Sequence, residues 1–395
     1  MLAKRLATER GVGFDAPMSM AVHLSPPPAL SALLPFSDDI PDSRWGKGNA
    51  LQFAQLLREF YRDADFHKFF AAHQPMYHLA EERFGAIMAD FDLNWYKEFY
   101  GEVPRGRFNL ILGMNNGGGN YGPKVVFPDR QEELYAIIGS WSEDDSGDPT
   151  YDKGYLGMII HEFNHSFINP LVDERKDKFA SAEEVYKDVA DKMQANAYGS
   201  SEVMIQESLV RAAVILYFES HGHDSRETGG RIYAEQANGF LWMDDLCGLL
   251  RQYAAQRSKY PTFSSFMPAV VQFYRELSPR IAEMKAGFEK SCVRVTGLQS
   301  FPNHSQDVDP TIRELIVTFD KPLDPGHYTI KPGLDGQQHF PITGKPEYLP
   351  GNLSIKLPIT LKPEWSYSFV LTCPAFVPPG GSPFENYTVD FKTRR

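Results

Sequence analysis

The chain has 395 residues, more than one ordinary hydrophobic core accommodates, so two or three domains are expected. Its composition, 42% hydrophobic and 23% charged residues, is that of a folded protein and excludes a disordered or collagen-like chain. The formal net charge of −11 argues against a nucleic-acid partner, because phosphate binding requires clustered lysine and arginine.

The first 48 residues are expected to be irregular, because prolines interrupt the segments 25–28 and 35–41. Apolar residues then recur at helical spacing and predict a helix over residues 49–72. A second helical stretch is expected over about residues 76–100, with a break near Asp92.

The hydrophobic period then changes to that of strands. Residues 107–113 predict a strand, and shorter strands are expected at 123–127 and 133–138. The acidic segment 143–149 contains glycine and proline and is expected to be a loop. The strongly apolar segment 154–169 predicts a buried helix, which Pro170 is expected to end because proline disfavours helical backbone at the residue before it.

Helices are expected to dominate residues 180–290, and short strands with proline and glycine turns follow from about residue 293. The β-rich runs are Leu315–Phe319, His327–Ile330, Leu353–Leu357, Tyr367–Leu371 and Tyr387–Phe391. Short strands at this regular spacing indicate a β-sandwich. The sequence therefore predicts a domain over residues 1–292 and a second, all-β domain over residues 296–395.

The apolar helix carries a motif with metal-ligand spacing, His161-Glu162-Phe163-Asn164-His165. Histidines at i and i+4 lie on one face of a helix, where two imidazoles can bind Zn²⁺. Glu162 stands where a carboxylate can act as general base on a water held by the metal. The alternative is a buried helix with two structural histidines and a salt-bridged glutamate.

A catalytic zinc site requires a third protein ligand. Glu207 is the best candidate, because it stands in an apolar helical stretch where a buried carboxylate needs a partner. Arg211, one turn further on, is the alternative partner for Glu207. Glu202 and Glu219 are held as reserve ligands.

The motif followed by a helix with a glutamate resembles the gluzincin class of zinc peptidases, the thermolysin-like grouping. More closely, residues 13–24, 161–170 and 207–213 resemble the DUF4932 family, which is found largely in Bacteroidetes and regarded as gluzincins. The resemblance covers about residues 1–290. It implies an α+β, zincin-like catalytic domain, mostly helical with a small mixed sheet, and further sequence before Leu2.

The resemblance also bears on single residues. Thermolysin-like enzymes place a tyrosine that stabilises the oxyanion between the motif and the glutamate ligand, and Tyr198 is the matching residue here. An ordinary packed tyrosine is the alternative. These enzymes often carry an aspartate one turn after the glutamate ligand, whereas this chain has Arg211.

Residues 308–324 resemble bacterial Ig-like modules of surface-layer and secreted proteins. The resemblance implies an Ig-like sandwich that acts as a spacer or adhesion unit. It favours export to the periplasm or surface of a bacterium, although the basic residues at the start of this sequence do not read as a secretory signal. Since no run of about 18 apolar residues occurs, no membrane span is expected.

These observations predict a zinc-dependent metallopeptidase that hydrolyses peptide bonds in a peptide or protein substrate. A zinc hydrolase of non-peptide amides is one alternative. Another is a cell-surface binding protein that retains a gluzincin-like scaffold without catalysis. Glu162 counts against the binding protein, because a binding scaffold needs no general base.

Overall fold

The computed structural model describes the whole chain except residues 1, 103–105, 117–118, 324–328, 335 and 373–383. The chain forms two compact units, one comprising Met1–Lys176 with Tyr253–Met267 and the other Asp177–Gln252 with Pro268–Arg395. The predicted multidomain organisation is confirmed, with helices in the N-terminal part and small β-sheets in the C-terminal part. Among the described residues, none of the helices has the length and apolar character needed to cross a membrane.

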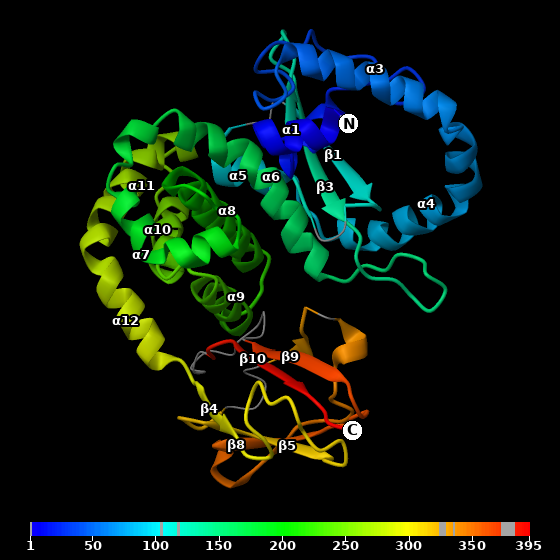
Figure 1. The fold of residues 1–395 in the computed structure, drawn as a ribbon. Helices are drawn as coiled ribbons and strands as arrows, with labels where there is room; N and C mark the ends of the chain where they lie inside the picture. The colour runs from blue at the N-terminus through cyan, green and yellow to red at the C-terminus, as the bar shows by residue number, and fades with distance from the viewer. Residues whose placement is uncertain (1, 103–105, 117–118, 324–328, 335, 373–383) are drawn as a thin grey trace. The chain divides into compact units, whose positions relative to one another are not determined.

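The first unit opens with helices, continues with a small sheet and closes on a long helix (Figure 1). Its elements are α1 (Leu2–Arg10), α2 (Asp15–Val22), α3 (Lys47–Asp63), α4 (Phe66–Met88), α5 (Asn94–Tyr100), β1 (Gly106–Gly113), β2 (Lys124–Val126), β3 (Glu132–Gly139) and α6 (Gly154–Asp173). The predicted break near Asp92 is present between α4 and α5. The three strands and the loop at 143–149 also lie where they were expected.

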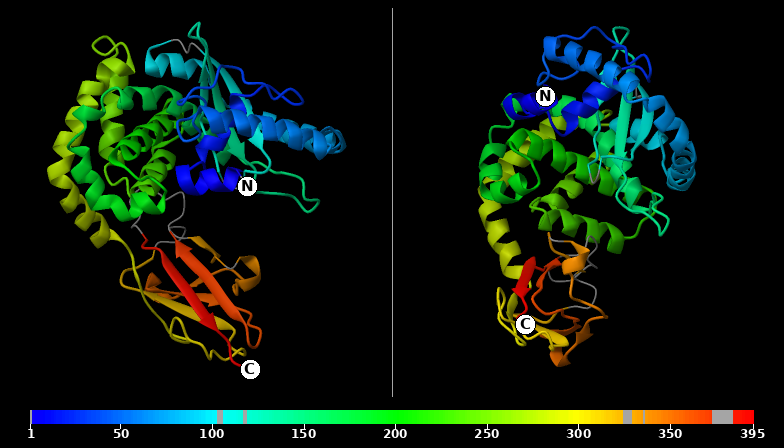
Figure 2. Two further views of the ribbon diagram at one scale, coloured as in Figure 1. Left: turned by 45° about the horizontal axis from the view of Figure 1, so that its top comes forward. Right: turned by 45° about the vertical axis from the view of Figure 1, so that its right-hand side comes forward.

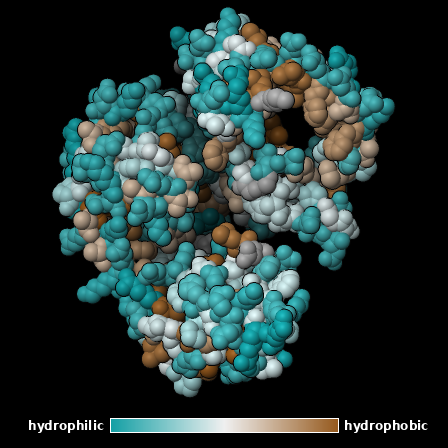
Figure 3. Space-filling model, viewed as in Figure 1, coloured by the Kyte–Doolittle hydropathy of each residue, from teal (hydrophilic) through white to brown (hydrophobic). Residues whose placement is uncertain are grey.

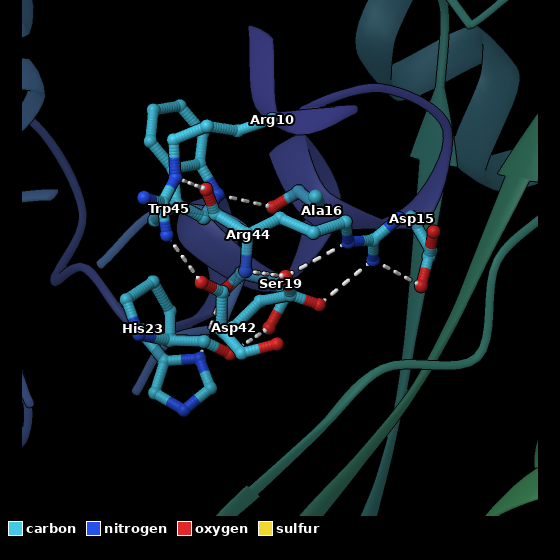
Figure 4. Close-up of polar contacts among 10 residues, drawn as sticks. Arg10, Asp15, Ala16, Ser19, His23, Asp42, Arg44 and Trp45 are labelled. Atoms are coloured by element: carbon cyan, nitrogen blue, oxygen red, sulfur yellow. Dashed lines mark hydrogen bonds and ion pairs between the residues drawn. The ribbon is translucent and has the colours of Figure 1, made fainter. Parts of the chain in front are cut away.

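The expectation of an irregular N-terminus was wrong, because α1 and α2 form there. Polar contacts tie these short helices to the loop that precedes α3 (Figure 4). Arg44 forms ion pairs at 2.7 Å with both Asp15 and Asp42, and Trp45 donates its indole N–H to the Ala16 carbonyl at 2.9 Å. The contacts of Arg44 with Asp15 and of Trp45 with Ala16 each join residues 29 positions apart, so local periodicity could not reveal them.

The predicted boundary between the next two helices was also misplaced. The chain turns at Ala64 and at Asp65, which has a positive φ of 51°, and α4 then continues through Pro75. Around this turn α3 and α4 carry exposed apolar side chains, visible as brown and tan atoms in Figure 3. They include Leu56, Phe60, Phe69 and Phe70.

The small sheet has the strand order β1-β3-β2. β1 runs parallel to β3, and β2 pairs antiparallel with β3, so the sheet is mixed as expected. One face packs on α6, where the ring of Phe108 in β1 lies 4.7 Å from the ring of Phe163. The sheet thereby fixes the helix that carries the histidine motif.

The helix α6 extends past Pro170 to Asp173, so the predicted end at Asn169 was wrong. Proline removes one backbone donor from the helix. The extra turn nevertheless buries Val172 completely, and this burial favours the continued helix.

The second unit begins with the helices that were predicted between residues 180 and 290. They are α7 (Ala182–Ala195), α8 (Ser201–Ser220), α9 (Ser225–Ala237), α10 (Met243–Ala255), α11 (Phe263–Leu277) and α12 (Ile281–Ser291). Single-turn 3₁₀ helices at Lys176–Lys178 and Ser278–Arg280 precede α7 and α12. α10 and α11 each have residues in both units.

The C-terminal part contains two antiparallel sheets. Their strands are β4 (Val295–Leu298), β5 (Glu314–Phe319), β6 (Thr329–Pro332), β7 (Glu347–Tyr348), β8 (Ser354–Pro358), β9 (Ser366–Thr372) and β10 (Tyr387–Lys392). The strand orders are β10-β9-β6 and β4-β5-β8-β7, and the pair β9 and β10 is seen in orange and red in Figure 2. β4 and β7 were not predicted, and the first residues of the predicted run 327–330 lie outside the described residues.

Both sheets contribute to one hydrophobic core, and its buried residues extend from Val293 to Phe391. This core supports independent folding of the C-terminal part. We therefore expect a fragment of residues 293–395 to unfold cooperatively in denaturant. A fragment of residues 296–395 should be less stable by about 1–3 kcal/mol, because it lacks Val293, which is 1% exposed and pairs with Phe384. Unfolding of 293–395 without cooperativity would show that this core depends on the preceding helices.

Candidate metal centre

The two motif histidines lie one turn apart on the same face of α6. The Nε2 atoms of His161 and His165 are 3.1 Å from each other, and the two rings lie 4.8 Å apart. Two imidazole nitrogens that face each other at this distance can share one metal ion. The helical spacing read from the sequence therefore produces the expected pair.

Buried contacts also hold α6 in place. Asn164, which lies between the two histidines in the sequence, is fully buried, and its Oδ1 accepts a hydrogen bond from the Tyr100 hydroxyl at 2.9 Å. Burial raises the pKa of Tyr100 well above its usual range, so the hydroxyl keeps the proton that it donates. The ring of Tyr100 also stacks on Phe167 at 4.4 Å.

Asn169 orients the second histidine. Its Oδ1 lies 3.2 Å from Nδ1 of His165. A proton on Nδ1 donates to this oxygen and leaves Nε2 as the ligand atom. The sequence suggested only that Asn169 ends the helix; a polar residue four positions after His165 in an apolar helix was the signal for the second role.

The candidate third ligand, Glu207, lies on α8 and is 7% exposed. Ser200 caps this helix by accepting a hydrogen bond from the Val203 N–H at 3.2 Å. The Glu207 carboxylate forms an ion pair with Nε of Arg211 at 3.3 Å. The alternative partner considered for Glu207 is thus present beside it.

His161, His165 and Glu207 form a group that could hold a metal ion, since their ligand atoms all lie within 4.8 Å of one another. Two imidazoles and one carboxylate are a donor set of catalytic zinc sites, which keep a further position open. The reserve residue Glu219 instead pairs with Arg251 at 2.7 Å. The other reserve, Glu202, is not among the three residues of this group.

The candidate general base, Glu162, is 6% exposed. The segment that leads into β2 crosses α6 at this residue, because a Cβ atom on Gly122 would lie 2.3 Å from the Glu162 carbonyl oxygen. Only glycine fits such an approach between two backbones. The edge of the sheet and the motif helix therefore meet at Glu162.

Tyr198 lies in the loop between α7 and α8. Its hydroxyl oxygen accepts a hydrogen bond from Nη2 of Arg211 at 2.6 Å. Burial raises the pKa of Tyr198 to about 12; Arg211 acts to lower it and Glu207 acts to raise it. The phenol therefore stays protonated at neutral pH and can donate its hydrogen.

A comparison with models of known protein families finds one match. The family model described as "Domain of unknown function (DUF4932)" matches residues 1–273. The chain belongs to the DUF4932 family. No curated protein matches it.

Among solved structures, this DUF4932 protein is similar to surface layer protein SbsC, domains 1-6, with 16% identity and a TM-score of 0.19. That match covers 60% of this chain and 33% of the SbsC chain. A second match, to the N-terminal part of SbsC, has 14% identity and a TM-score of 0.19 and covers 64% of this chain and 60% of the other. The chain thus spans less than two thirds of either structure, and similarity at these scores supports no conclusion about fold or function.

Two residues near the group were not anticipated as parts of a site. Arg211 was considered as an alternative partner for Glu207 and as a departure from the thermolysin-like pattern, and Glu235, from α9, was not considered. Arg211 Nη1 lies 3.0 Å and 2.8 Å from the two carboxylate oxygens of Glu235. The sequence held no local signal for this contact, because 24 residues separate the partners.

Proposed function

We propose that this DUF4932 protein is a zinc-dependent metallopeptidase that binds Zn²⁺ through His161, His165 and Glu207. The observation that carries the proposal is the gathering of these three residues, with ligand atoms within 4.8 Å of one another. The contact between His165 and Asn169 adds support, because zinc-bound histidines usually donate their other ring N–H to an oxygen.

When bound, zinc supplies a Lewis acid that polarises a carbonyl group and acidifies water. Glu162 takes the proton from the attacking water and passes it to the leaving amine. Its low exposure favours proton transfer, because bulk water is kept away from the carboxylate. Tyr198, protonated at neutral pH, donates a hydrogen bond to the oxygen of the scissile carbonyl as negative charge develops there.

The sheet edge beside α6 supports a peptide as the substrate. Tyr121 exchanges hydrogen bonds with Ile137 at 3.0 Å and 2.8 Å, and Pro123 accepts one from Tyr135 at 3.0 Å. In an antiparallel pair, the alternate residues direct their N–H and C=O groups to the other side. Gly122 and Lys124 therefore present backbone groups to which an extended peptide can add as a strand.

The finer architecture belongs to the same proposal. Residues 1–292 form a zincin-like catalytic domain, and residues 296–395 form an Ig-like sandwich that spaces this domain from a surface or another module. Two antiparallel sheets around one core support the sandwich. We propose export to the periplasm or cell surface on the Ig-like resemblance of residues 308–324.

The proposal is tested with the purified protein and three substrate classes: casein, short peptides and acylated amino acids. Near-stoichiometric zinc and hydrolysis of casein or peptides are expected, with loss of both after treatment with a chelator. Hydrolysis of acylated amino acids alone would identify a hydrolase of non-peptide amides. Stoichiometric zinc without hydrolysis of any substrate would favour a binding protein.

We predict that Asn169→Leu lowers the affinity for zinc about 10- to 100-fold, because His165 loses the oxygen that fixes its ring. The measurement is competition with a chromophoric chelator. Ser166→Ala is the matched control on α6, since the Ser166 hydroxyl is buried without a hydrogen-bond partner. Equal affinities in the two variants would contradict the orienting role of Asn169.

A further inference from the structure

The Glu207 side chain lies in a network of charged and polar groups, of which the peptidase proposal uses only Tyr198 besides Glu207 itself. Arg211, one turn after Glu207 on α8, reaches the Glu207 carboxylate with Nε at 3.3 Å. Its Nη1 donates to both oxygens of Glu235 on α9, and its Nη2 donates to Tyr198. The guanidinium also lies over the ring of Phe240, 5.1 Å from the centroid.

The contacts with Glu235, Tyr198 and Phe240 hold the guanidinium of Arg211 in place. An arginine side chain has many rotamers, and holding it in one of them costs conformational entropy. The two oxygens of Glu235 and the phenol oxygen of Tyr198 select one orientation of the guanidinium. In that orientation Nε forms an ion pair with Glu207 at 3.3 Å without the geometry of a hydrogen bond. Arg211 and Glu235 each have side chains 19% exposed, so the ion pair is shielded from most of the screening that weakens surface pairs.

We infer that Arg211 and Glu235 act together as positioning residues for Glu207, fixing the rotation of its carboxylate before the metal binds. The inference rests on the proposed metal site. The supporting contact reaches the carboxylate ligand itself, from the position where thermolysin-like enzymes often have an aspartate. Tyr198 belongs to this network through the hydrogen bond from Arg211.

The test compares positioning with simple stabilisation. Removing one partner of a buried pair leaves an uncompensated charge, whereas replacing both with apolar residues of similar size is often neutral. The double variant Arg211→Met/Glu235→Leu leaves no lone charge at Glu235, but Glu207 loses its ion pair with Arg211. Its metal-free form should therefore fold and unfold at a lower temperature than the wild type. Its zinc affinity should fall about 10- to 100-fold, the usual range for groups that orient a ligand. The visible spectrum of its Co²⁺ form should also change, because the geometry of the carboxylate ligand changes.

Two further variants make the result decisive. Glu235→Gln keeps the shape of the side chain and should also lower zinc affinity relative to the wild type. This variant tests the inference even if the double variant does not fold. Arg251→Met/Glu219→Leu removes an ion pair of α8 that does not contact Glu207, and its zinc affinity and Co²⁺ spectrum should stay at wild-type values.

The outcomes separate this inference from the proposed function. Wild-type affinity and spectrum in both Glu235→Gln and the double variant, with zinc bound to the wild-type protein, would overturn the positioning role alone. A wild-type protein that binds no zinc would overturn the metal site and the positioning role together.

Discussion

Replacing Glu162 with glutamine is expected to abolish peptide hydrolysis while the protein keeps its zinc. The amide has nearly the shape of the carboxylate, so the buried position stays filled and α6 stays folded. It cannot take a proton from water at neutral pH. Loss of a general base typically lowers the rate about 10²- to 10⁴-fold, or about 3–5 kcal/mol in activation free energy.

The measurement combines kcat/KM on a peptide with metal analysis of the same sample. Glu174→Gln is the matched control, because Glu174 caps the same helix and is exposed. Both its zinc content and its rate should match those of the wild type. A Glu162→Gln protein with the wild-type rate would rule out the proposed mechanism, and one that lost zinc would place Glu162 among the ligands.

The histidine pair could be predicted from the sequence because it depends only on helical geometry. Residues at i and i+4 share a face of any helix, and the apolar segment 154–169 made the helix itself predictable. Glu207 could be proposed because a carboxylate in an apolar helical stretch needs a partner. Its place in a group with the histidines depends on tertiary structure, which no local pattern encodes.

The residues that surround the ligands were not predicted in this way. Glu235 meets Arg211 only because α8 and α9 pack together, and no local pattern encodes that contact. Asn169 is different, because it lies one turn after His165 on α6 and its spacing was a local signal that the prediction did not use. Tertiary structure also explains the missed α1 and α2, whose contacts with the segment before α3 span long stretches of sequence.

The third ligand should be the most sensitive position for metal binding on α8. We predict that Glu207→Ala lowers zinc affinity by more than the roughly 10- to 100-fold that loss of an orienting residue costs. Two imidazoles remain, and a catalytic zinc site normally has three protein ligands. The metal-free protein should still fold, because Arg211 keeps its ion pair with Glu235 when the Glu207 carboxylate is removed.

Competition with a chelator measures the affinity, and circular dichroism verifies the fold of the metal-free protein. Glu202→Ala is the matched control, since Glu202 lies on the same helix and is not one of the three grouped residues. It should bind zinc as the wild type does. If Glu207→Ala retains full affinity and Glu202→Ala loses it, the ligand is the residue at the start of α8. The contact between Arg211 and Glu207 would then be an ordinary salt bridge, which is the alternative that the sequence left open for this pair.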